Sequence, residues 1–346
     1  MKKILVLTAL CLMAMIGHAN NYREDGGKYR YEAQKIIEQT YNVDENPILE
    51  MVGKYSDFII TPWDQQKIDF KVKIIVKSND EDKLKAKFNS IDVKFDQFGN
   101  KVTAETVFGD YKYRTFNGTM TIKYYVKVPR DVFMELETKY GDIKVETVAK
   151  NLEVDIKYGD LKADSLLADN SIDIKYGDIN INYAKNIELE LDYGDAKVRN
   201  CDKIDAELRY SNIYITELNE GNIENKYSTV KIERAAKITF DDAAYSDLKV
   251  SNVTNKIIAD MRYCDLKATI TTLKPVVELE GQYTDMTLYI KEDASFDYNL
   301  KSSYSDIIFR GFFETKSIKG HGSYGNGERG RLDINTSYGD VKINKE

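Results

Sequence analysis

The sequence is poor in the residues that most enzymes use for catalysis and metal binding. Only two histidines occur in 346 residues, and one of them, His18, lies in an N-terminal segment that we expect to be cleaved. Histidine is the commonest metal ligand and titrates nearest to neutral pH. The other, His321, lies in the glycine-rich stretch IKGHGSYGNGERG, which is typical of a surface loop. We therefore predict no catalytic residues, no metal site, no cofactor and no enzymatic activity.

Blocks of positive charge and long apolar runs are also missing. Lysines and arginines alternate finely with acidic residues, and the formal net charge is −7. A protein that binds nucleic acid or an anionic membrane surface normally carries a basic patch. After the N-terminal segment, no stretch approaches the ~20 apolar residues of a membrane-spanning helix. We therefore expect no nucleic-acid partner and no transmembrane segment in the mature chain.

Residues 1–19 have the layout of a signal peptide. Lys2 and Lys3 precede an apolar stretch, and Gly17, His18 and Ala19 form a small-x-small cleavage site. An uncleaved anchor helix is the less favoured alternative because the apolar stretch is short for a membrane span. Cleavage would change the formal charge to −9. The pattern predicts an exported protein of the periplasm, the outer membrane surface or the extracellular space.

Tyrosine, in contrast, is abundant, and it marks an internal repeat. ETKYGDIKVE at residues 137–146 is followed by DIKYGDLKAD at 155–164 and DIKYGDININ at 173–182. A Tyr-x-Asp/Asn/Thr unit continues at intervals of 17 to 21 residues, with a final interval of 14. It occurs at Tyr140, Tyr158, Tyr176, Tyr193, Tyr210, Tyr227, Tyr245, Tyr263, Tyr283, Tyr304, Tyr324 and Tyr338, with an earlier copy at Tyr55. A fixed period of this length indicates stacked repeats.

Each repeat has the alternation of two short strands. Apolar residues stand three and five positions after the tyrosine, as in Ile143 and Val145, and at even offsets before it, as in Val154 and Ile156. A period of two indicates strands. The alternation slips by one residue just after the tyrosine, which predicts a bend or bulge there. The copy at Tyr324 lacks the apolar pair.

Two strands in 17 or 18 residues leave no room for a helix, and so small a unit cannot bury its own apolar face. Stacked copies can, one layer upon the next. We therefore predict an all-β fold, a single-stranded β-solenoid of about twelve coils of 17–21 residues, over residues 131–346. The alternative is a chain of β-hairpins with Gly-Asp turns. A type II′ turn needs glycine at its first central position, where many copies have Ser, Thr or Cys, so the solenoid is favoured.

The tyrosines and the aspartates two residues later are predicted to form structural ladders. We favour tyrosine rings that pack the corner of the core, and the alternative is a flat aromatic strip that binds sugars or a protein. For the aspartates we favour capping of turn N–H groups over a calcium ladder, because calcium needs six to eight oxygens. The ladder residues are Tyr140, Tyr158, Tyr176, Tyr193, Tyr210, Tyr227, Tyr245, Tyr263, Tyr283, Tyr304, Tyr338, Asp142, Asp160, Asp178, Asp195, Asp247, Asp265, Asp285, Asp306 and Asp340.

Two cysteines remain after the predicted cleavage. Cys201 follows its tyrosine by eight residues, whereas Cys264 directly follows Tyr263, about four coils further along. A disulfide needs Cα atoms within about 7 Å, and four layers at ~4.8 Å exceed that distance. We expect two free thiols.

The segment before the repeats is predicted to have longer strands and lacks the regular tyrosine spacing. Residues 20–47 form a polar N-terminal segment, and residues 48–130 a β-rich region that we expect to cap the first edge of the solenoid. Within it, Ser78–Ile91 predicts one short helix that starts at a Ser/Asn cap. Trp63, the only tryptophan, is interpreted as a packing residue.

The stretches YYVKVPRDVFMELETKYGDIKVE and MVGKYSDFIITPWDQQKIDFKVKIIVKS resemble a bacterial exported repeat family of unknown function. In that family a V-x-V-P segment precedes strands ending in T-x-x-G-D-I-x-V. Its members are labelled "putative adhesin" or auto-transporter-adhesin-like, and the resemblance, from about Ile48 to the C-terminus, implies a β-solenoid. This chain departs in placing tyrosine before nearly every Gly-Asp and in replacing glycine by Ser, Thr or Cys in the middle copies.

These observations favour an exported, non-enzymatic β-solenoid of the cell envelope, an adhesin-like structural or binding protein. Its expected partner is a protein or glycan of the envelope. One alternative is a periplasmic scaffold or partner of another envelope protein. A β-helix carbohydrate-active enzyme is less favoured, because the loops between repeats are too short to build a cleft.

Overall fold

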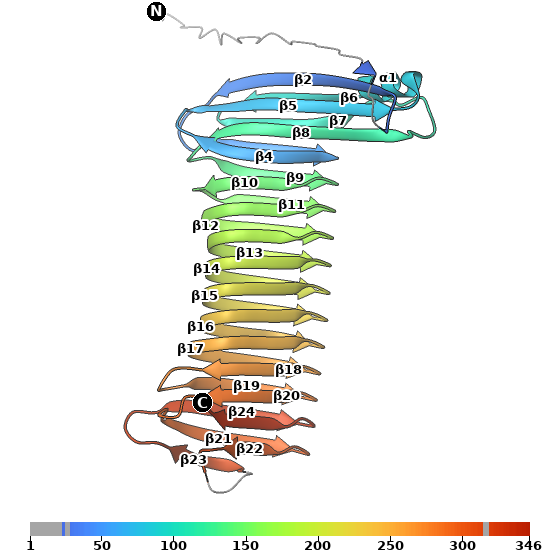
Figure 1. Cartoon of the computed structure of the whole chain (residues 1–346). Coiled ribbons are helices and arrows are strands. Elements are labelled where there is room, and N and C mark those ends of the chain that lie inside the picture. Colours follow the sequence, from blue (N-terminus) through green and yellow to red (C-terminus); the bar gives the residue numbers. More distant parts are fainter. Residues whose placement is uncertain (1–22, 25–27, 314–317) are drawn as a thin grey trace, which may run out of the picture.

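The computed structural model describes residues 23–24, 28–313 and 318–346, and the predicted signal peptide lies outside them. Figure 1 shows a long stack of strands with a wider layer at its N-terminal end. All strands of the described chain belong to one 25-stranded sheet system. The prediction of an all-β solenoid with a β-rich cap and one short helix is confirmed.

Strands of the cap are long, and several pair antiparallel. β2 pairs with β5, β5 with β8, and β6 with β7 in this way. The helix α1 begins after Asp80, whose side chain accepts a hydrogen bond from Lys83 N at 3.0 Å, so its cap lies one residue later than the predicted Ser/Asn pair. The cap elements are β1 (Arg23–Glu24), β2 (Tyr31–Asn42), β3 (Ile48–Lys54), β4 (Ser56–Trp63), β5 (Lys67–Ser78), α1 (Glu81–Asn89), β6 (Ile91–Phe98), β7 (Lys101–Phe108) and β8 (Gly118–Pro129).

Two strands of the cap, β3 and β4, form a coil of the solenoid stack. β3 and β4 flank Tyr55 and pair parallel with β9 and β10 on one side and with β7 and β8 on the other. The first layer of the solenoid is therefore the copy at Tyr55, which lies 85 residues before the next in sequence. The cap strands cover its outer edge, where an unpaired parallel strand would otherwise offer free N–H and C=O groups.

The regular coils pair parallel and in register. Ile143 lies beside Leu161, Leu161 beside Ile179, and Ile179 beside Ala196. Parallel pairing between successive copies excludes the chain of hairpins, whose neighbouring strands would be antiparallel. The elements are β9 (Phe133–Lys139), β10 (Ile143–Val148), β11 (Leu152–Lys157), β12 (Leu161–Lys175), β13 (Ile179–Asp192), β14 (Asp195–Arg209), β15 (Asn212–Lys226), β16 (Thr229–Ala244), β17 (Asp247–Arg262), β18 (Asp265–Ile270), β19 (Val276–Gln282) and β20 (Asp285–Ile290).

In each coil, the segment after one tyrosine and the segment before the next lie on two facing sides of the stack. The chain reverses sharply at the tyrosine and more gently at the opposite bend, where strands such as β12 continue through a register shift. Leu166, Ala184, Cys201 and Leu218 fill the inside of that gentle bend and are buried. The apolar residues predicted to point inward form one continuous core along the stack. The two outer faces carry the alternating polar residues.

The last coils are stacked out of chain order. β24 pairs parallel with both β19 and β21, and β25 with both β20 and β22. The coil of Tyr338 therefore lies between those of Tyr283 and Tyr304, although chain order would place it last. These elements are β21 (Phe296–Ser303), β22 (Ile307–Arg310), β23 (Gly320–Tyr324), β24 (Gly330–Ser337) and β25 (Val341–Lys345).

The copy at Tyr324 explains this departure. It has Gly327 and Arg329 where other copies place their inward apolar pair, so it cannot form a layer of the core. Instead β23 pairs antiparallel with β21, and Tyr324 packs against Phe296 and the ring of Phe312. After the coil of Tyr304, the chain thus returns toward the N-terminal end of the stack, and the coil of Tyr338 lies between those of Tyr283 and Tyr304.

Candidate functional site: the faces and tyrosine corner of the solenoid

The broad face formed by the strands that precede each tyrosine is rich in acidic residues. Glu135 lies beside Glu153, and Asp155 beside Asp173, in columns that run across the coils. Partial burial raises the pKa of Asp173, and the nearby carboxylate of Asp155 adds to the rise. Adjacent carboxylates one strand apart repel each other unless a cation intervenes.

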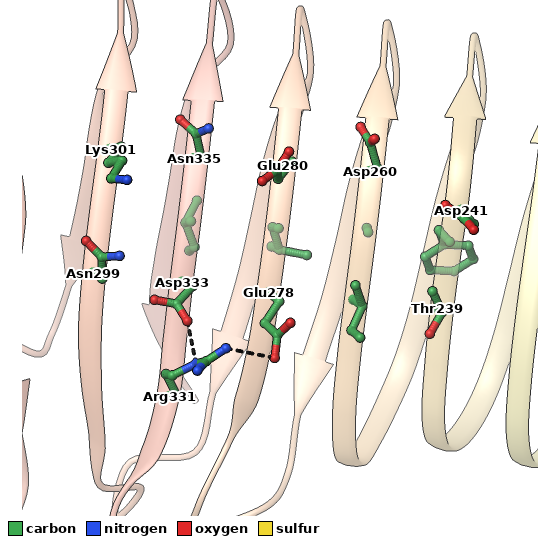
Figure 2. A pocket seen from close by; sticks show the side chains of 15 residues that line it. Thr239, Asp241, Asp260, Glu278, Glu280, Asn299, Lys301, Arg331, Asp333 and Asn335 are labelled. Atoms are coloured by element: carbon green, nitrogen blue, oxygen red, sulfur yellow. Dashed lines mark ion pairs between the residues drawn. The ribbon is translucent and has the colours of Figure 1, made fainter.

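A shallow hollow of about 390 Å³ lies on this face near the C-terminal end. In Figure 2 its side chains stand in two rows on neighbouring strands, and Arg331 bridges Glu278 and Asp333. The Arg331–Glu278 separation is 3.0 Å. No histidine, serine or cysteine lines it. Three of its charged groups, Arg331, Glu278 and Asp333, therefore already pair with each other.

The residues with most chemical reactivity are scattered. His321 lies on β23 and is exposed. Cys201 and Cys264 are free and buried, and burial raises the pKa of the Cys201 thiol to about 12 and also raises that of Cys264. Among the described residues, no three His, Cys, Asp or Glu side chains are grouped so that they could hold a metal ion. Trp63 donates its indole N–H to Lys67 O at 2.8 Å at the edge of the cap.

The sharp corner depends on an unusual backbone conformation of the tyrosine itself. The tyrosines of the stack have φ between 51° and 64°, in the left-handed region. This conformation costs a non-glycine residue about 1–2 kcal/mol. It reverses the chain in one residue and causes the slip in alternation that the sequence shows. The positive φ thus falls on the tyrosine, and the Gly or Ser that follows it has ordinary backbone angles.

The tyrosine rings stack on one another along the whole solenoid. Consecutive ring centroids are 4.8 to 5.1 Å apart, and the ring planes differ by 2° to 12°. Stacked pairs contribute about 0.5–1.5 kcal/mol beyond their buried area, which offsets much of the backbone cost. The order is Tyr55, Tyr140, Tyr158, Tyr176, Tyr193, Tyr210, Tyr227, Tyr245, Tyr263, Tyr283, Tyr338 and Tyr304.

These rings lie outside the core, contrary to the favoured interpretation. Those between the two ends of the ladder are 40 to 52% exposed. The alternative of a flat aromatic strip does not describe them either, because consecutive rings stack with nearly parallel planes and so form no single flat surface. Tyr304, at the end of the ladder, is 83% exposed, whereas the other end is covered by Phe108, edge to face with Tyr55 at 6.1 Å.

In the coils from Tyr140 to Tyr193 the corner is completed by glycine and aspartate. Asp178 N donates to Asp160 Oδ1 at 2.8 Å, and Asp195 N to Asp178 Oδ1 at 3.0 Å. Each carboxylate thus caps the N–H of the next coil, whereas the sequence suggested capping within one turn. A Cβ on Gly177 would lie 1.8 Å from Gly159 O. Glycine is required because the backbones approach too closely for any side chain.

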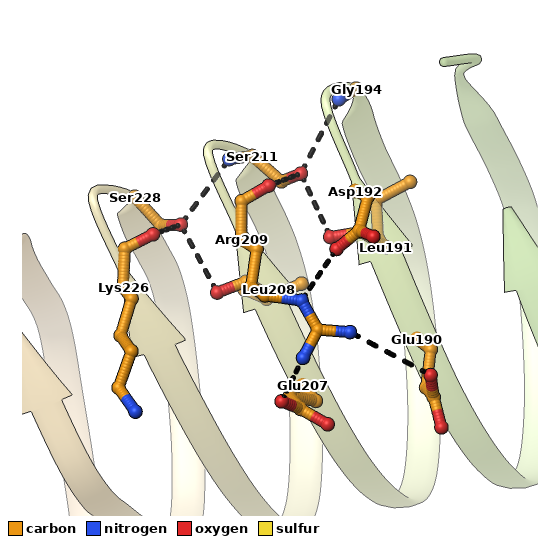
Figure 3. A network of polar contacts seen from close by, with 10 residues as sticks. All are labelled: Glu190, Leu191, Asp192, Gly194, Glu207, Leu208, Arg209, Ser211, Lys226 and Ser228. Carbon is orange, nitrogen blue, oxygen red and sulfur yellow. Dashed lines mark hydrogen bonds and ion pairs between the residues drawn. The ribbon is translucent and has the colours of Figure 1, made fainter. Parts of the chain in front are cut away.

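In the coils from Tyr210 to Tyr283 the same position holds a buried Ser, Cys or Thr. Ser228 Oγ donates to Lys226 O at 2.8 Å and accepts a hydrogen bond from Ser211 N at 3.2 Å, as Figure 3 shows. The N–H two residues after the tyrosine now bonds to a backbone carbonyl: Asp247 N donates to Ser228 O at 3.2 Å. The side chains of Asp247 and Asp265 are therefore not needed as acceptors, whereas Asp285, in the coil of Tyr283, again accepts a hydrogen bond from Asp340 N at 2.9 Å.

The boundary between the two kinds of corner carries the arginine seen in Figure 3. Arg209 Nε donates to Asp192 Oδ1 at 2.8 Å, and its guanidinium also pairs with Glu190 and Glu207. The hydrogen bond to Asp192 raises the pKa of Arg209. One cation thus links carboxylates of two coils at a place where the acidic columns are densest.

Fold and corner together define the protein as a two-sided parallel β-solenoid with an external tyrosine ladder. The chain belongs to the Toastrack DUF4097 family, whose pattern matches residues 42–241 and 219–344. No curated protein matches it.

Several solved structures are similar at low identity. A "putative lipid binding protein" from Parabacteroides distasonis is 9% identical, with 89% of this chain and 96% of that chain covered and a TM-score of 0.37. A "putative adhesin" from the same species is 13% identical, with 74% and 97% covered and a TM-score of 0.37. A "putative adhesin" from Bacteroides fragilis is 13% identical, with 90% and 97% covered and a TM-score of 0.29.

Proposed function

We propose that the protein is an exported, non-enzymatic component of the cell envelope that acts as an adhesin-like structural or binding protein. The observation that carries this proposal is the repetition of the same surface groups, coil after coil, on a rigid parallel stack. Extended solenoids present long faces on which many weak contacts with one partner add together. The partner class that fits such a surface is a protein or glycan of the envelope.

The character of the outer surface supports a binding role over catalysis. The hollow near the C-terminal end is open, and Arg331 within it pairs with Glu278 and Asp333. The loops between coils are short, so they build no deep cleft in which water would be excluded from a reacting group.

Export rests on the predicted signal peptide. Within the described residues, the one helix, α1, has nine residues, and no helix meets the length and apolarity of a membrane span. We therefore expect the mature chain to reach the envelope by secretion and to be held there by its partner.

Fractionation with protease accessibility on intact cells tests the proposal. We expect the full chain in the envelope or medium and digestion of the surface-exposed protein by added protease. A chain without residues 2–19 should stay in the cytosol and serves as the control. Protection in the periplasm would favour a scaffold of another envelope protein instead. Recovery of the full-length chain in the cytosol would overturn export and with it the proposed function.

A further inference from the structure

A groove follows the tyrosine ladder in the coils from Tyr227 to Tyr283. It has a volume of about 650 Å³ and runs across the coils. One wall is formed by the tyrosines, and the floor by Ser228, Ser246 and Cys264. The other wall is formed by Thr229, Asp247 and Asp265, which stand two residues after their tyrosines.

The carboxylates of Asp247 and Asp265 are free of partners within the described chain. Their backbone N–H groups bond to Ser228 O and Ser246 O, so no neighbouring N–H uses the side chains. In the glycine corners the equivalent carboxylates of Asp160 and Asp178 each accept such an N–H. The groove thus combines two unpaired carboxylates with a row of tyrosine hydroxyls. Within the described residues, these hydroxyls also make no hydrogen bond.

The charges around the groove select against ionic ligands. Asp247 and Asp265 within it repel a polyanion. Beyond the acidic wall, Lys249 and Lys267 are exposed on the same strands, and on the other side of the rings Arg262 is exposed. Lys249 and Lys267 repel a polycation, whereas Arg262 is paired with Asp242 at 3.8 Å.

The spacing suits a linear ligand. Ring centroids along the groove are 4.8 to 5.0 Å apart, the separation of neighbouring strands. One sugar residue of an extended polysaccharide advances by a similar distance, so each residue can meet one tyrosine hydroxyl and one side chain of the opposite wall. Carboxylates accept hydrogen bonds from hydroxyls strongly, because the acceptor is charged.

We propose that this groove binds a neutral, hydroxyl-rich linear polysaccharide that lies along the corner. The inference deepens the proposed function and rests on it for its biological setting. Asp247 and Asp265 accept hydrogen bonds from sugar hydroxyls, and the hydroxyls of Tyr245 and Tyr263 complete the contact. The glycine corners lack this capacity because their carboxylates already serve the next coil.

Isothermal titration calorimetry with the purified mature chain tests the groove. The probes are β-1,4-linked hexasaccharides of glucose, xylose and mannose as neutral ligands, a chitosan hexamer as the cation and hexagalacturonate as the anion. We expect at least one neutral probe to bind, and both charged probes to bind more weakly. Binding of none of the neutral probes, or stronger binding of a charged one, would overturn the proposal.

Paired variants locate the site. D247N/D265N should weaken binding of the neutral probe by about tenfold or more, since hydrogen bonds to charged groups are lost. D160N/D178N, which keeps an amide oxygen as acceptor for the next coil, should bind within about twofold of the unchanged chain. Y245F/Y263F keeps the stacked rings and removes two hydroxyls, so it should also weaken binding. Equal affinity of the first and second variants would exclude the groove.

The two proposals fail separately. Calorimetry uses purified protein. A cytosolic location would therefore overturn the proposed function without changing the affinity measured for the polysaccharide probes. A chain that reaches the envelope, but whose groove variants bind every probe as the unchanged chain does, would overturn the groove alone.

Discussion

The coils from Tyr140 to Tyr193 and those from Tyr210 to Tyr283 build the same corner with different chemistry. In the first set a glycine allows two backbones to meet, and an aspartate caps the next coil. In the second set a buried hydroxyl or thiol fills the space, and from Tyr210 to Tyr263 backbone carbonyls take over the capping. Ring spacing is the same in both, and the tyrosine φ differs little, at 56° to 64° in the first set and 51° to 53° in the second. The comparison teaches that the tyrosine sets the corner and that the following residues only decide how its N–H groups are bonded.

The largest expected effect comes from putting a side chain into a glycine corner. Gly177→Ala places a Cβ where Gly159 O lies at 1.8 Å, so the backbones must separate. We expect a loss of about 3 kcal/mol in the free energy of unfolding, measured by urea denaturation. Gly109→Ala is the control, because its Cβ would meet nothing nearer than 3.8 Å. Equal losses for both variants would show that close approach does not define the glycine corner.

The serine corner should be sensitive to loss of its hydroxyl. Ser228→Ala leaves the buried N–H of Ser211 without its acceptor. An unsatisfied buried donor costs about 1–3 kcal/mol, to be measured by thermal and urea unfolding. Ser251→Ala, on the exposed side of β17, serves as the control. If Ser228→Ala unfolds like the unchanged chain, the hydroxyl ladder does not support the corner.

Removing the aspartate two residues after the tyrosine should lower stability in the coils with glycine corners and leave it nearly unchanged in the coils with serine or cysteine corners. Asp160→Ala deprives Asp178 N of its acceptor, and we expect a loss of about 1 kcal/mol. Asp247→Ala removes a carboxylate that serves no N–H, and the expected change is within about 0.5 kcal/mol. Urea midpoints of the two variants, measured side by side, check the difference. A larger loss for Asp247→Ala would reverse our assignment of the capping groups.

The smallest expected effect on the free energy of unfolding is confined to high pH. Cys201 lies inside the gentle bend, and burial raises the pKa of its thiol to about 12 from an ordinary 9.0. The folded state therefore holds this proton more tightly than the unfolded chain. Its contribution to stability is complete below about pH 9 and is lost as the pH rises from there toward 12.

We expect the unfolding free energy to fall with pH in that window, as followed by urea denaturation. The decline should be smaller in Cys201→Ala, which copies the alanines Ala184 and Ala235 of the same column. A decline of the same slope in the variant would assign it to other groups.

The alternating pattern was sufficient to predict the solenoid, because inward residues such as Ile143 and Leu161 repeat with the period that parallel pairing requires. The left-handed tyrosine was not predicted, since that conformation is rare for a bulky residue and only the slip in alternation signalled it. The exposure of the rings was also missed, because phase with the core does not say on which side of the corner a side chain lies.

The order of the last coils could not be predicted from spacing alone. Tyr324 carries the tyrosine signature, yet Gly327 and Arg329 give it no apolar pair, and that defect was the available signal. The acidic columns arise from register, which places Asp155 beside Asp173, and a list of charges does not show it. The domain boundaries, the export route and the role of the ladder residues stay predictions.

The coil of Tyr338 has a consequence for biogenesis. It follows both of its neighbouring layers in the chain, yet it lies between them. Adding layers strictly in chain order therefore cannot produce this stack, because β24 pairs with β19 on one side and with β21 on the other. The strands β21 and β22 gain their parallel partners only once β24 and β25, which follow them in the chain, have been made.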